Sequence, residues 1–266
     1  MNIFVLDENP AKAAEYHCNK HVVKMILEST QMLSAVHWLH LEKRMIGGIS
    51  TAKSKIPKRV RDRKELIIKS VKKDEIPPYS MTHIRHPCTV WSCFTYGNYM
   101  WLLELAQALS NEYTKRYKKI HKSQAAIDWL TNHPPPGIPI KARTPFAVAI
   151  KNPDYRILDP NSMILLGEDD VGKNGKSAAL NWEMVRDSGI KSGCITDENL
   201  NPINFEDIRS FSNLKDLAVN KQLYYTYYDV VESYRRYYIK DKVRFAKWEP
   251  HTAMPKWFKE GINAGK

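Results

Sequence analysis

The stretch PAKAAEYHCNKHVVKMILESTQMLSAVHWLH, residues 10–40, decides the fold. Asn9 and Pro10 are a typical helix start, because Asn caps free N–H groups and Pro suits the first helical position. No Gly or Pro follows until Gly47, so the stretch predicts one long helix. Its circumference is mostly apolar, which is typical of a buried helix. Evidence for strands is thin elsewhere, so we predict a mainly α fold: a single helical domain built on a long buried N-terminal helix.

One ionisable stripe interrupts this apolar surface. At roughly 100° per residue, six side chains fall within a single arc of about 100°. They are His17, Lys20, His21, Lys24, Glu28 and Gln31. Because an unpaired buried charge is costly, the stripe must face a partner, water or a cleft. We interpret it as the floor of a site.

The stripe fits an acid/base and nucleophile set. A lysine that is desolvated beside other cations has a lowered pKa, so its amine can attack carbon or form an imine. Lys24 has this setting, and Glu28 one turn later could relay protons. A structural ion pair with i, i+4 spacing explains the same two residues.

A metal site is a further reading of the stripe. His17 and His21 have the i, i+4 spacing of two ligands on one helix face, and His83, His86 and Cys88 could complete the set. Neighbouring lysines oppose a divalent ion, however, and hydrogen-bonded histidines explain the same residues. We expect neither a metal nor a cofactor.

Composition describes an ordinary globular protein. The chain has 266 residues, of which 43% are hydrophobic and 26% charged. It contains no apolar run long enough for a membrane span, and its start, MNIFVLDENP, has no basic region typical of a secretory signal. The four cysteines lack the pattern of a disulfide framework. We therefore expect no membrane partner, and a location in the cytoplasm, that of the host cell if a phage encodes the chain.

The net charge of +12 is unevenly distributed. Residues 43–73 contain twelve Lys and Arg against two acids, a net charge of +10. Such a concentration is expected for a polyanion partner, most simply nucleic acid, although a solvated loop has the same composition. Candidate contacts in this segment are Arg59, Arg61, Arg63 and Lys64.

The remaining chain completes the single domain, 1–266, with two insertions. MNIFVL reads as a short strand or a buried packing segment, and the basic insertion, 43–76, holds a helix near 58–72. A second strong helix is predicted from near Cys88 to about Ser123. Residues 151–213 form an irregular insertion with a short helix near 177–186, and a last helix covers 217–244.

Three further groups of residues are candidates for nucleic-acid contacts. The first is the junction HIRHP, residues 83–87, where Pro87 keeps His86 out of helical geometry. Free backbone N–H groups at the start of the following helix, together with Arg85, could bind an anion. The alternative is a rigid turn without a ligand. The others combine basic and aromatic side chains, which hold bases and backbone together, although several of the tyrosines must be core. They are Arg116, His121 and Lys122 in one group, and Arg235, Arg236, Trp257 and Lys259 in the other.

Four stretches resemble a family of phage-encoded helical proteins. They are MNIFVLDENPAKAAEYHCNKHVVKMILE, THIRHPCTVW, EYTKRYKKIHKS, and the closing YRRYY with PKWF. This family is similar to the endonuclease V type of pyrimidine-dimer DNA glycosylase, a small all-helical enzyme. The resemblance implies that His17, Glu28 and His86 lie at the site and that PKWFK, residues 255–259, closes the chain.

In that enzyme type the amine of a small second residue attacks the sugar C1′. Here residue 2 is Asn, which is too large for easy removal of Met1, so the nucleophile is the Met1 amine or a lysine such as Lys24. The Arg-Glu dipeptide of the glycosylase helix is missing, and Glu28 is farther from His17 than in that pattern. The resemblance implies a DNA glycosylase with lyase activity that acts on double-stranded DNA with an extruded base. The alternatives are a phage transferase that modifies pyrimidines in DNA and a DNA-binding protein without catalysis.

Overall fold

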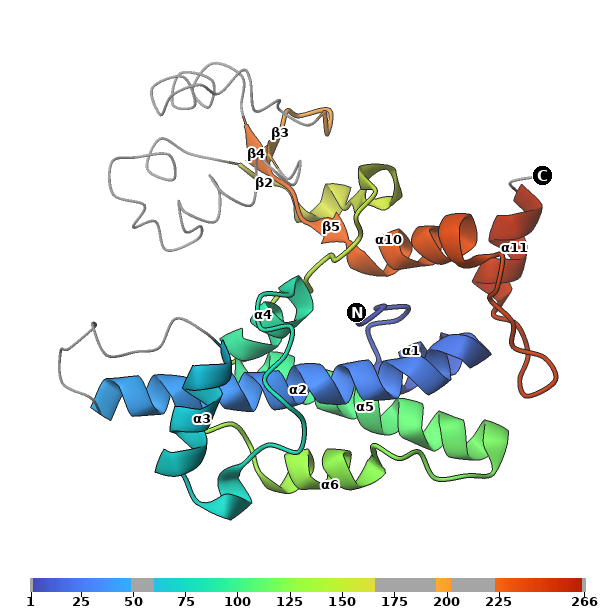
Figure 1. The fold of residues 1–266 in the computed structure, drawn as a ribbon. Helices are drawn as coiled ribbons and strands as arrows, with labels where there is room; N and C mark the ends of the chain where they lie inside the picture. The colour runs from blue at the N-terminus through green and yellow to red at the C-terminus, as the bar shows by residue number, and fades with distance from the viewer. Residues whose placement is uncertain (1, 49–59, 166–194, 202–222, 265–266) are drawn as a thin grey trace. The chain divides into compact units, whose positions relative to one another are not determined.

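The computed structural model describes residues 2–48, 60–165, 195–201 and 223–264. The chain forms two compact units: Met1–Lys151 together with Tyr234–Lys266, and Asn152–Ser233. The second unit begins at the boundary expected for the irregular insertion and continues past its expected end at residue 213. The short helix predicted at 177–186 lies outside the described residues. The mainly helical character predicted from the sequence is confirmed (Figure 1).

Two helices replace the one long helix predicted for residues 10–40. α1 covers Pro10–Tyr16 and α2 covers Asn19–Gly48, and the backbone between them is extended at His17, with ψ of 133°. The predicted start is confirmed, because the Asn9 side chain accepts hydrogen bonds from two backbone N–H groups of the first turn. The prediction of an uninterrupted helix is wrong.

Side chains that are distant in sequence stabilise this break by hydrogen bonds to its backbone carbonyls. The carbonyls of Glu15 and His17 accept hydrogen bonds from the Arg116 guanidinium, and the carbonyl of Tyr16 accepts one from the indole N–H of Trp248. Backbone carbonyls that lose their helical partners must find others, and these side chains supply them. A periodic pattern reports only local preference, so it could not show this break.

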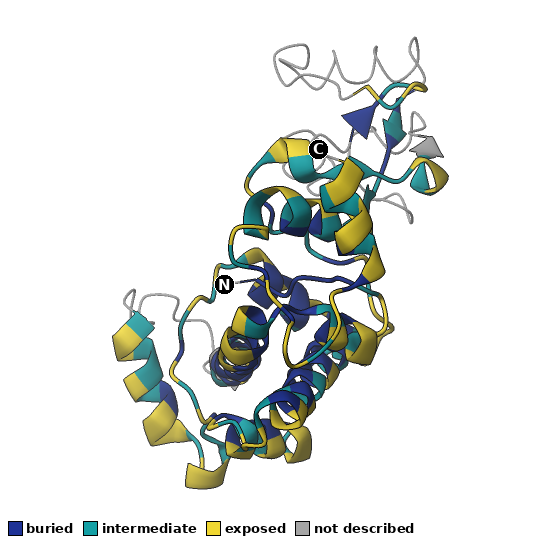
Figure 2. Cartoon of the chain, turned by 90° about the vertical axis from the view of Figure 1, so that its right-hand side faces the viewer, coloured by how far each residue is buried: buried dark blue, intermediate teal, exposed yellow. Residues whose placement is uncertain are grey.

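α2 is the helix against which most of the first unit packs. It contacts α3 (Val60–Ser70), α4 (Pro87–Phe94), α5 (Tyr96–Tyr117) and α6 (Gln124–Asn132), and α5 runs alongside it (Figure 1). The sides of the helices that face one another are buried (Figure 2), and the fully buried side chains include Ile26, Leu33, Val36, Leu102, Leu105 and Leu109. The apolar surface of α2 is not buried throughout, because Val23 is 41% and Leu27 38% exposed.

The second strong helix of the sequence is also divided. α4 ends at Phe94, and Thr95 takes an extended conformation, φ −142° and ψ 156°, from which its hydroxyl caps α5 by accepting the Asn98 N–H. α5 ends at Tyr117, before Lys118 in the left-handed region, and α6 follows as a separate helix. The prediction of one helix from near Cys88 to about Ser123 is therefore wrong.

Gly97, in the first turn of α5, allows the loop of residues 139–143 to pack directly on the helix. Its N–H donates to the Lys141 carbonyl, and a Cβ at this position would overlap the Arg143 backbone nitrogen and lie 2.7 Å from the Ala142 carbonyl carbon. We expect Gly97→Ala to cost about 3 kcal/mol of unfolding free energy, because backbone cannot yield as a side chain does. Urea denaturation measures this cost.

The matched control is Gly261→Ala in α11 (Lys256–Ala264). There the added Cβ meets only the flexible end of the Ile239 side chain, while alanine improves helix propensity. This variant is expected to stay within about 1 kcal/mol of the wild type. Equal losses in the two variants would contradict the close approach of the loop to α5.

The N-terminal residues 3–6 are buried, but they form no strand within the described chain. Phe4 has a positive φ of 39°, so the segment bends instead of extending, and its role is that of a packing segment. α3 falls within the predicted 58–72, although residues 49–59 lie outside the described chain. It packs on the second half of α2 through a cluster of Trp38, Leu41, Ile67 and Met81.

The second unit contains short antiparallel strands. β1 (Ile157–Leu158) pairs with β5 (Tyr228–Asp229), and a second sheet has the order β2 (Ile164–Leu165), β4 (Tyr224–Tyr225), β3 (Ile195–Thr196). Short 3-10 turns, η3 (Pro153–Tyr155) and η4 (Pro160–Ser162), flank β1.

The last helix predicted at 217–244 is wrong in its first part. Residues 217–222 lie outside the described chain, and the tyrosines that follow belong to β4 and β5, in agreement with the strand preference of tyrosine. Helix starts only at α10 (Val230–Tyr237) and continues into the π-helical turn η7 (Tyr238–Lys242). Among the described residues, no helix has the length and apolar character to cross a membrane.

Candidate functional site

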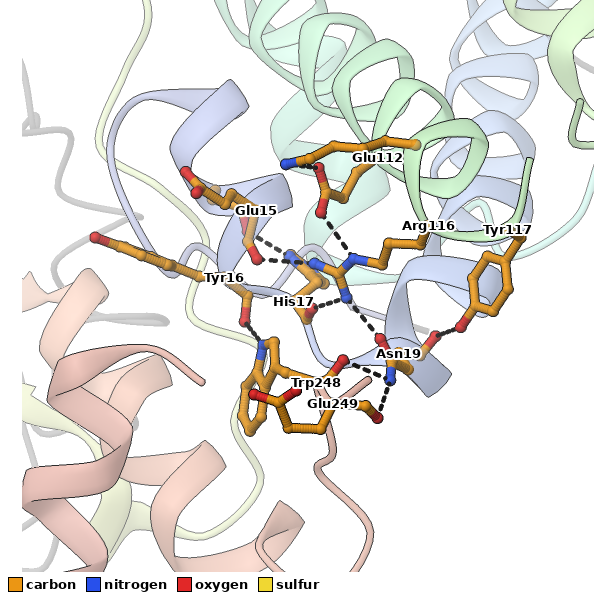
Figure 3. A network of polar contacts seen from close by, with 11 residues as sticks. Glu15, Tyr16, His17, Asn19, Glu112, Arg116, Tyr117, Trp248 and Glu249 are labelled. Carbon is orange, nitrogen blue, oxygen red and sulfur yellow. Dashed lines mark hydrogen bonds and ion pairs between the residues drawn. The ribbon is translucent and has the colours of Figure 1, made fainter. Parts of the chain in front are cut away.

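Arg116 is the centre of a buried polar network that joins three parts of the first unit (Figure 3). Its side chain is 0% exposed, its Nε donates to Glu112 at 2.7 Å, and its terminal nitrogens donate to the carbonyls of Glu15 and His17 and to the Asn19 side chain. Arg116 was a candidate phosphate contact, and that prediction is wrong because no part of the side chain reaches solvent. Its role is to hold the junction between α1 and α2.

This junction places two histidines against the N-terminal segment. His17 is fully buried and His21 is 5% exposed. The ring of Phe4 stacks on His21 with centroids 4.5 Å apart, and Nδ1 of His21 is hydrogen-bonded to the hydroxyl of Tyr238 in η7. The two histidines therefore line an aromatic cluster and not an open floor.

Burial keeps both histidines neutral. It is the main reason that the pKa of His17 is lowered to about 4 and that of His21 to about 2. For His21, His17 and the positive charges of Lys242, Lys24 and Lys20 contribute to the lower value. Nδ1 of His17 is engaged by the Ala13 carbonyl at 2.6 Å. The helix is broken at His17, and the ring centroids of His17 and His21 lie 6.4 Å apart, with the rings tilted by 60°. The described residues contain no group of three or more His, Cys, Asp or Glu side chains placed to hold a metal ion.

A third buried histidine, His37, lies outside the candidate site and allows a test of how burial lowers the pKa of a histidine. It is 2% exposed, its Nε2 lies 3.0 Å from the Tyr99 hydroxyl, and burial lowers its pKa from 6.5 to about 3. An unfolded histidine takes up a proton as the pH falls through about 6.5, whereas the folded one stays neutral until its own lower pKa. Stability is therefore retained above pH 6.5 and falls as the solution is acidified toward pH 4.

We expect His37→Gln, which keeps a partner for Tyr99, to reduce the slope of unfolding free energy against pH between 6.5 and 4 by about 1.4 kcal/mol per pH unit. Chemical denaturation at several pH values measures this slope. The exposed His251 provides the control, and His251→Gln should leave the slope unchanged. An unchanged slope in His37→Gln would contradict a neutral, buried His37.

Lys24 and Glu28 form the ion pair that their spacing allows, with Nζ and Oε1 3.2 Å apart. The Lys24 side chain is 59% exposed and that of Glu28 only 13%. Lys20 is exposed as well. The expectation of a desolvated lysine is therefore wrong for both lysines, and Glu28 is the more shielded partner of the ion pair.

Glu28 and the anchored start of the chain share Cys88 as a neighbour. Asn2 is 5% exposed, its Nδ2 donates to the Ala149 carbonyl at 2.9 Å, and its Oδ1 accepts from the Tyr234 hydroxyl at 2.7 Å. Burial is the main reason that the pKa of the Cys88 thiol is raised to about 12, and the charge of Glu28 contributes to this rise. The thiol also contacts the backbone of Ile3. Cys88, in α4, is therefore close both to the N-terminal segment and to α2. Met1 lies outside the described residues.

His86 lies directly before α4, two residues from Cys88. As predicted, Pro87 leaves it in extended geometry, φ −67° and ψ 135°, and its Nδ1 accepts the N–H of Cys88 at 3.2 Å. That N–H is therefore used for capping, which weakens the prediction of an anion site at this junction. Arg85 and His83 are exposed, and His83 has a positive φ of 54°.

Several basic candidates are paired with other side chains. Arg61 lies 3.3 Å from Glu65 and Arg63 lies 3.2 Å from Glu42, while Lys64 donates to Ser80. Arg59 lies outside the described residues. The excess charge of the basic segment is therefore partly balanced in the part of it that the structure describes.

Of the candidate nucleic-acid contacts near the C-terminus, some side chains pack against other residues and others are exposed to solvent. The Arg235 guanidinium lies 5.8 Å from the Tyr16 ring centroid and 5.5 Å from that of Trp257, and its Nε donates to the Leu6 carbonyl. These contacts leave Arg235 and Trp257 half-buried and packed against one another. Among the remaining candidates, His121 is half-buried and hydrogen-bonded to the Ser123 N–H, and three are exposed: Arg236, Lys122 and Lys259.

The sequence did not point to Phe4, Asn2, Tyr234, Tyr238 or Lys242 as neighbours of the stripe. The tyrosine-rich run was noticed, but its contacts with residues more than 200 positions earlier depend on the tertiary fold. Comparison with models of protein families, with curated proteins and with solved structures gives no match.

Proposed function

We propose that the protein acts on DNA, as an enzyme that excises a damaged pyrimidine and cleaves the strand through an amine nucleophile. The observation that carries this proposal is the shielded carboxylate of Glu28, which shares Cys88 as a neighbour with the anchored N-terminal segment. An amine that attacks the sugar C1′ needs a partner that moves protons, and the Glu28 carboxylate can serve as that partner.

In this reaction the amine nitrogen bonds to C1′ while the bond from C1′ to the base breaks and the base leaves with a proton. Opening of the sugar ring gives an imine, and loss of a C2′ proton expels the 3′ phosphate. Glu28 is suited to accept and return these protons, because its carboxylate is largely shielded from solvent and general acids and bases are most often carboxylates or histidines. The nucleophile that fits best is the amino-terminal amine, because Lys24 is exposed and paired with Glu28.

The net charge of +12 supports DNA as the polyanion. The target nucleotide has to leave the duplex before C1′ can be reached, which is the usual requirement for chemistry at a base.

The proposal is tested by strand cleavage of duplex DNA that carries one abasic site. Wild-type protein is expected to cleave at the site, and Lys12→Ala serves as a control that removes an exposed charge without touching Glu28. Tight, salt-sensitive binding with no cleavage would contradict the enzyme and leave a modifying enzyme or a binding protein.

A further inference from the structure

Three lysines gather around His21 and Phe245 in the first unit. Nζ of Lys20 lies 4.8 Å from the centroid of the Phe245 ring, and Nζ of Lys242 lies 6.0 Å from the same ring. Lys24 occupies the next turn of α2 after Lys20. The charges of all three lysines act on His21, the neutral side chain at the base of the group.

Lys242 is held in position by its surroundings. Its side chain is only 15% exposed, its Nζ lies 2.6 Å from Asp241, and it lies 4.3 Å above the ring of Tyr237. It ends the π-helical turn η7, which also brings Tyr238 to His21. Such turns are uncommon and occur frequently at functional sites.

The charges of this cluster do not balance. Within the described part of the chain, α2 contributes the charged groups Lys20, Lys24 and Glu28, and η7 contributes Asp241 and Lys242. Glu28 offsets Lys24 and Asp241 offsets Lys242, which leaves the charge of Lys20 in excess. One phosphodiester carries one negative charge, so it would neutralise the cluster.

We propose that Lys20, Lys24 and Lys242 bind one phosphate group of the DNA strand that carries the target nucleotide. This assignment rests on the proposed function and adds to it a fixed contact with the strand. Lys20, Lys24 and Glu28 follow one another at intervals of four residues along α2, about 6 Å per step, so Lys20 and Glu28 are about 12 Å apart along the helix axis.

The test compares binding of a duplex that contains a tetrahydrofuran abasic-site analogue by wild type, Lys20→Met, Lys242→Met and the double variant. We expect the double variant to bind roughly 10-fold more weakly, with a slope of log K against log salt reduced by about 1. Lys12→Met is the matched control, because Lys12 also lies over an aromatic ring, that of Tyr16, and should bind as the wild type does. Lys20 is exposed on a helix, so its variant keeps the test valid if Lys242→Met fails to fold.

A second arm separates a strand phosphate from free phosphate. Inorganic phosphate is added at constant ionic strength, and the melting temperature is measured for wild type and the double variant. A rise in the wild type alone would identify a site for free phosphate as well, whereas weaker DNA binding without such a rise would identify a strand phosphate. Unchanged DNA affinity, salt slope and melting temperature in the double variant would overturn the proposal. Wild-type cleavage of abasic DNA is measured in parallel, so the failure of the lysine cluster is distinguishable from the failure of the enzyme.

Discussion

Replacing Arg116 by methionine is expected to lower the free energy of unfolding by about 3–5 kcal/mol. The guanidinium is fully buried and donates to a carboxylate, to the Asn19 side chain and to two backbone carbonyls, so its removal leaves the Glu112 charge and two freed carbonyls without their donor. Urea denaturation followed by far-ultraviolet circular dichroism measures this loss. The same variant should loosen the junction between α1 and α2.

Lys115 provides the matched control, because it shares the partner Glu112. Its side chain is 61% exposed and its Nζ lies 3.4 Å from the carboxylate. Removing such a surface charge usually costs less than about 1 kcal/mol, so Lys115→Met should be nearly as stable as the wild type. Adding Glu112→Leu to Arg116→Met should restore part of the stability, since it removes the buried charge that was left behind. Similar stability for the two single variants would contradict a structural role for Arg116.

Glu28→Gln is expected to slow strand cleavage by about 100- to 10,000-fold, the range in which a general acid or base contributes to a reaction. The amide keeps the size of the side chain but cannot accept a proton, so DNA affinity and stability should change little. The rate is measured in a single turnover at saturating abasic DNA, which separates the chemical step from binding.

Lys24→Met is the control for this experiment. It breaks the ion pair with Glu28 but leaves the carboxylate in place, and at saturating DNA it should retain most of the rate. If both variants lose the rate equally, the ion pair and not the carboxylate is required, and the assigned role of Glu28 is wrong.

The sequence predicted the elements whose signals are local. Asn9 and Pro10 marked the start of α1, Pro87 marked the start of α4, and the helix within the basic segment was found within two residues of its ends. The divisions at His17 and Thr95 were missed. At His17 the reason is plain, because Arg116 and Trp248 bind the freed carbonyls from distant parts of the chain.

The candidate site was predicted less completely than the fold. The pairing of Lys24 with Glu28 follows from their spacing and was foreseen as an alternative. Burial was misjudged, because a stripe on one helix does not reveal which of its members other segments cover. Phe4 and Tyr238 cover His21, whereas Lys20 and Lys24 reach solvent.

Borohydride trapping tests the central claim, amine catalysis beside Glu28, most directly. Wild-type protein is incubated with duplex DNA carrying an abasic site, the imine is reduced, and the adduct is mapped by mass spectrometry of its peptides. We predict a covalent adduct on the peptide that carries the amino terminus, still formed by Lys24→Met and lost in Glu28→Gln. The absence of any adduct from wild-type protein on fully bound DNA, or an adduct on the Lys24 peptide, would contradict this account.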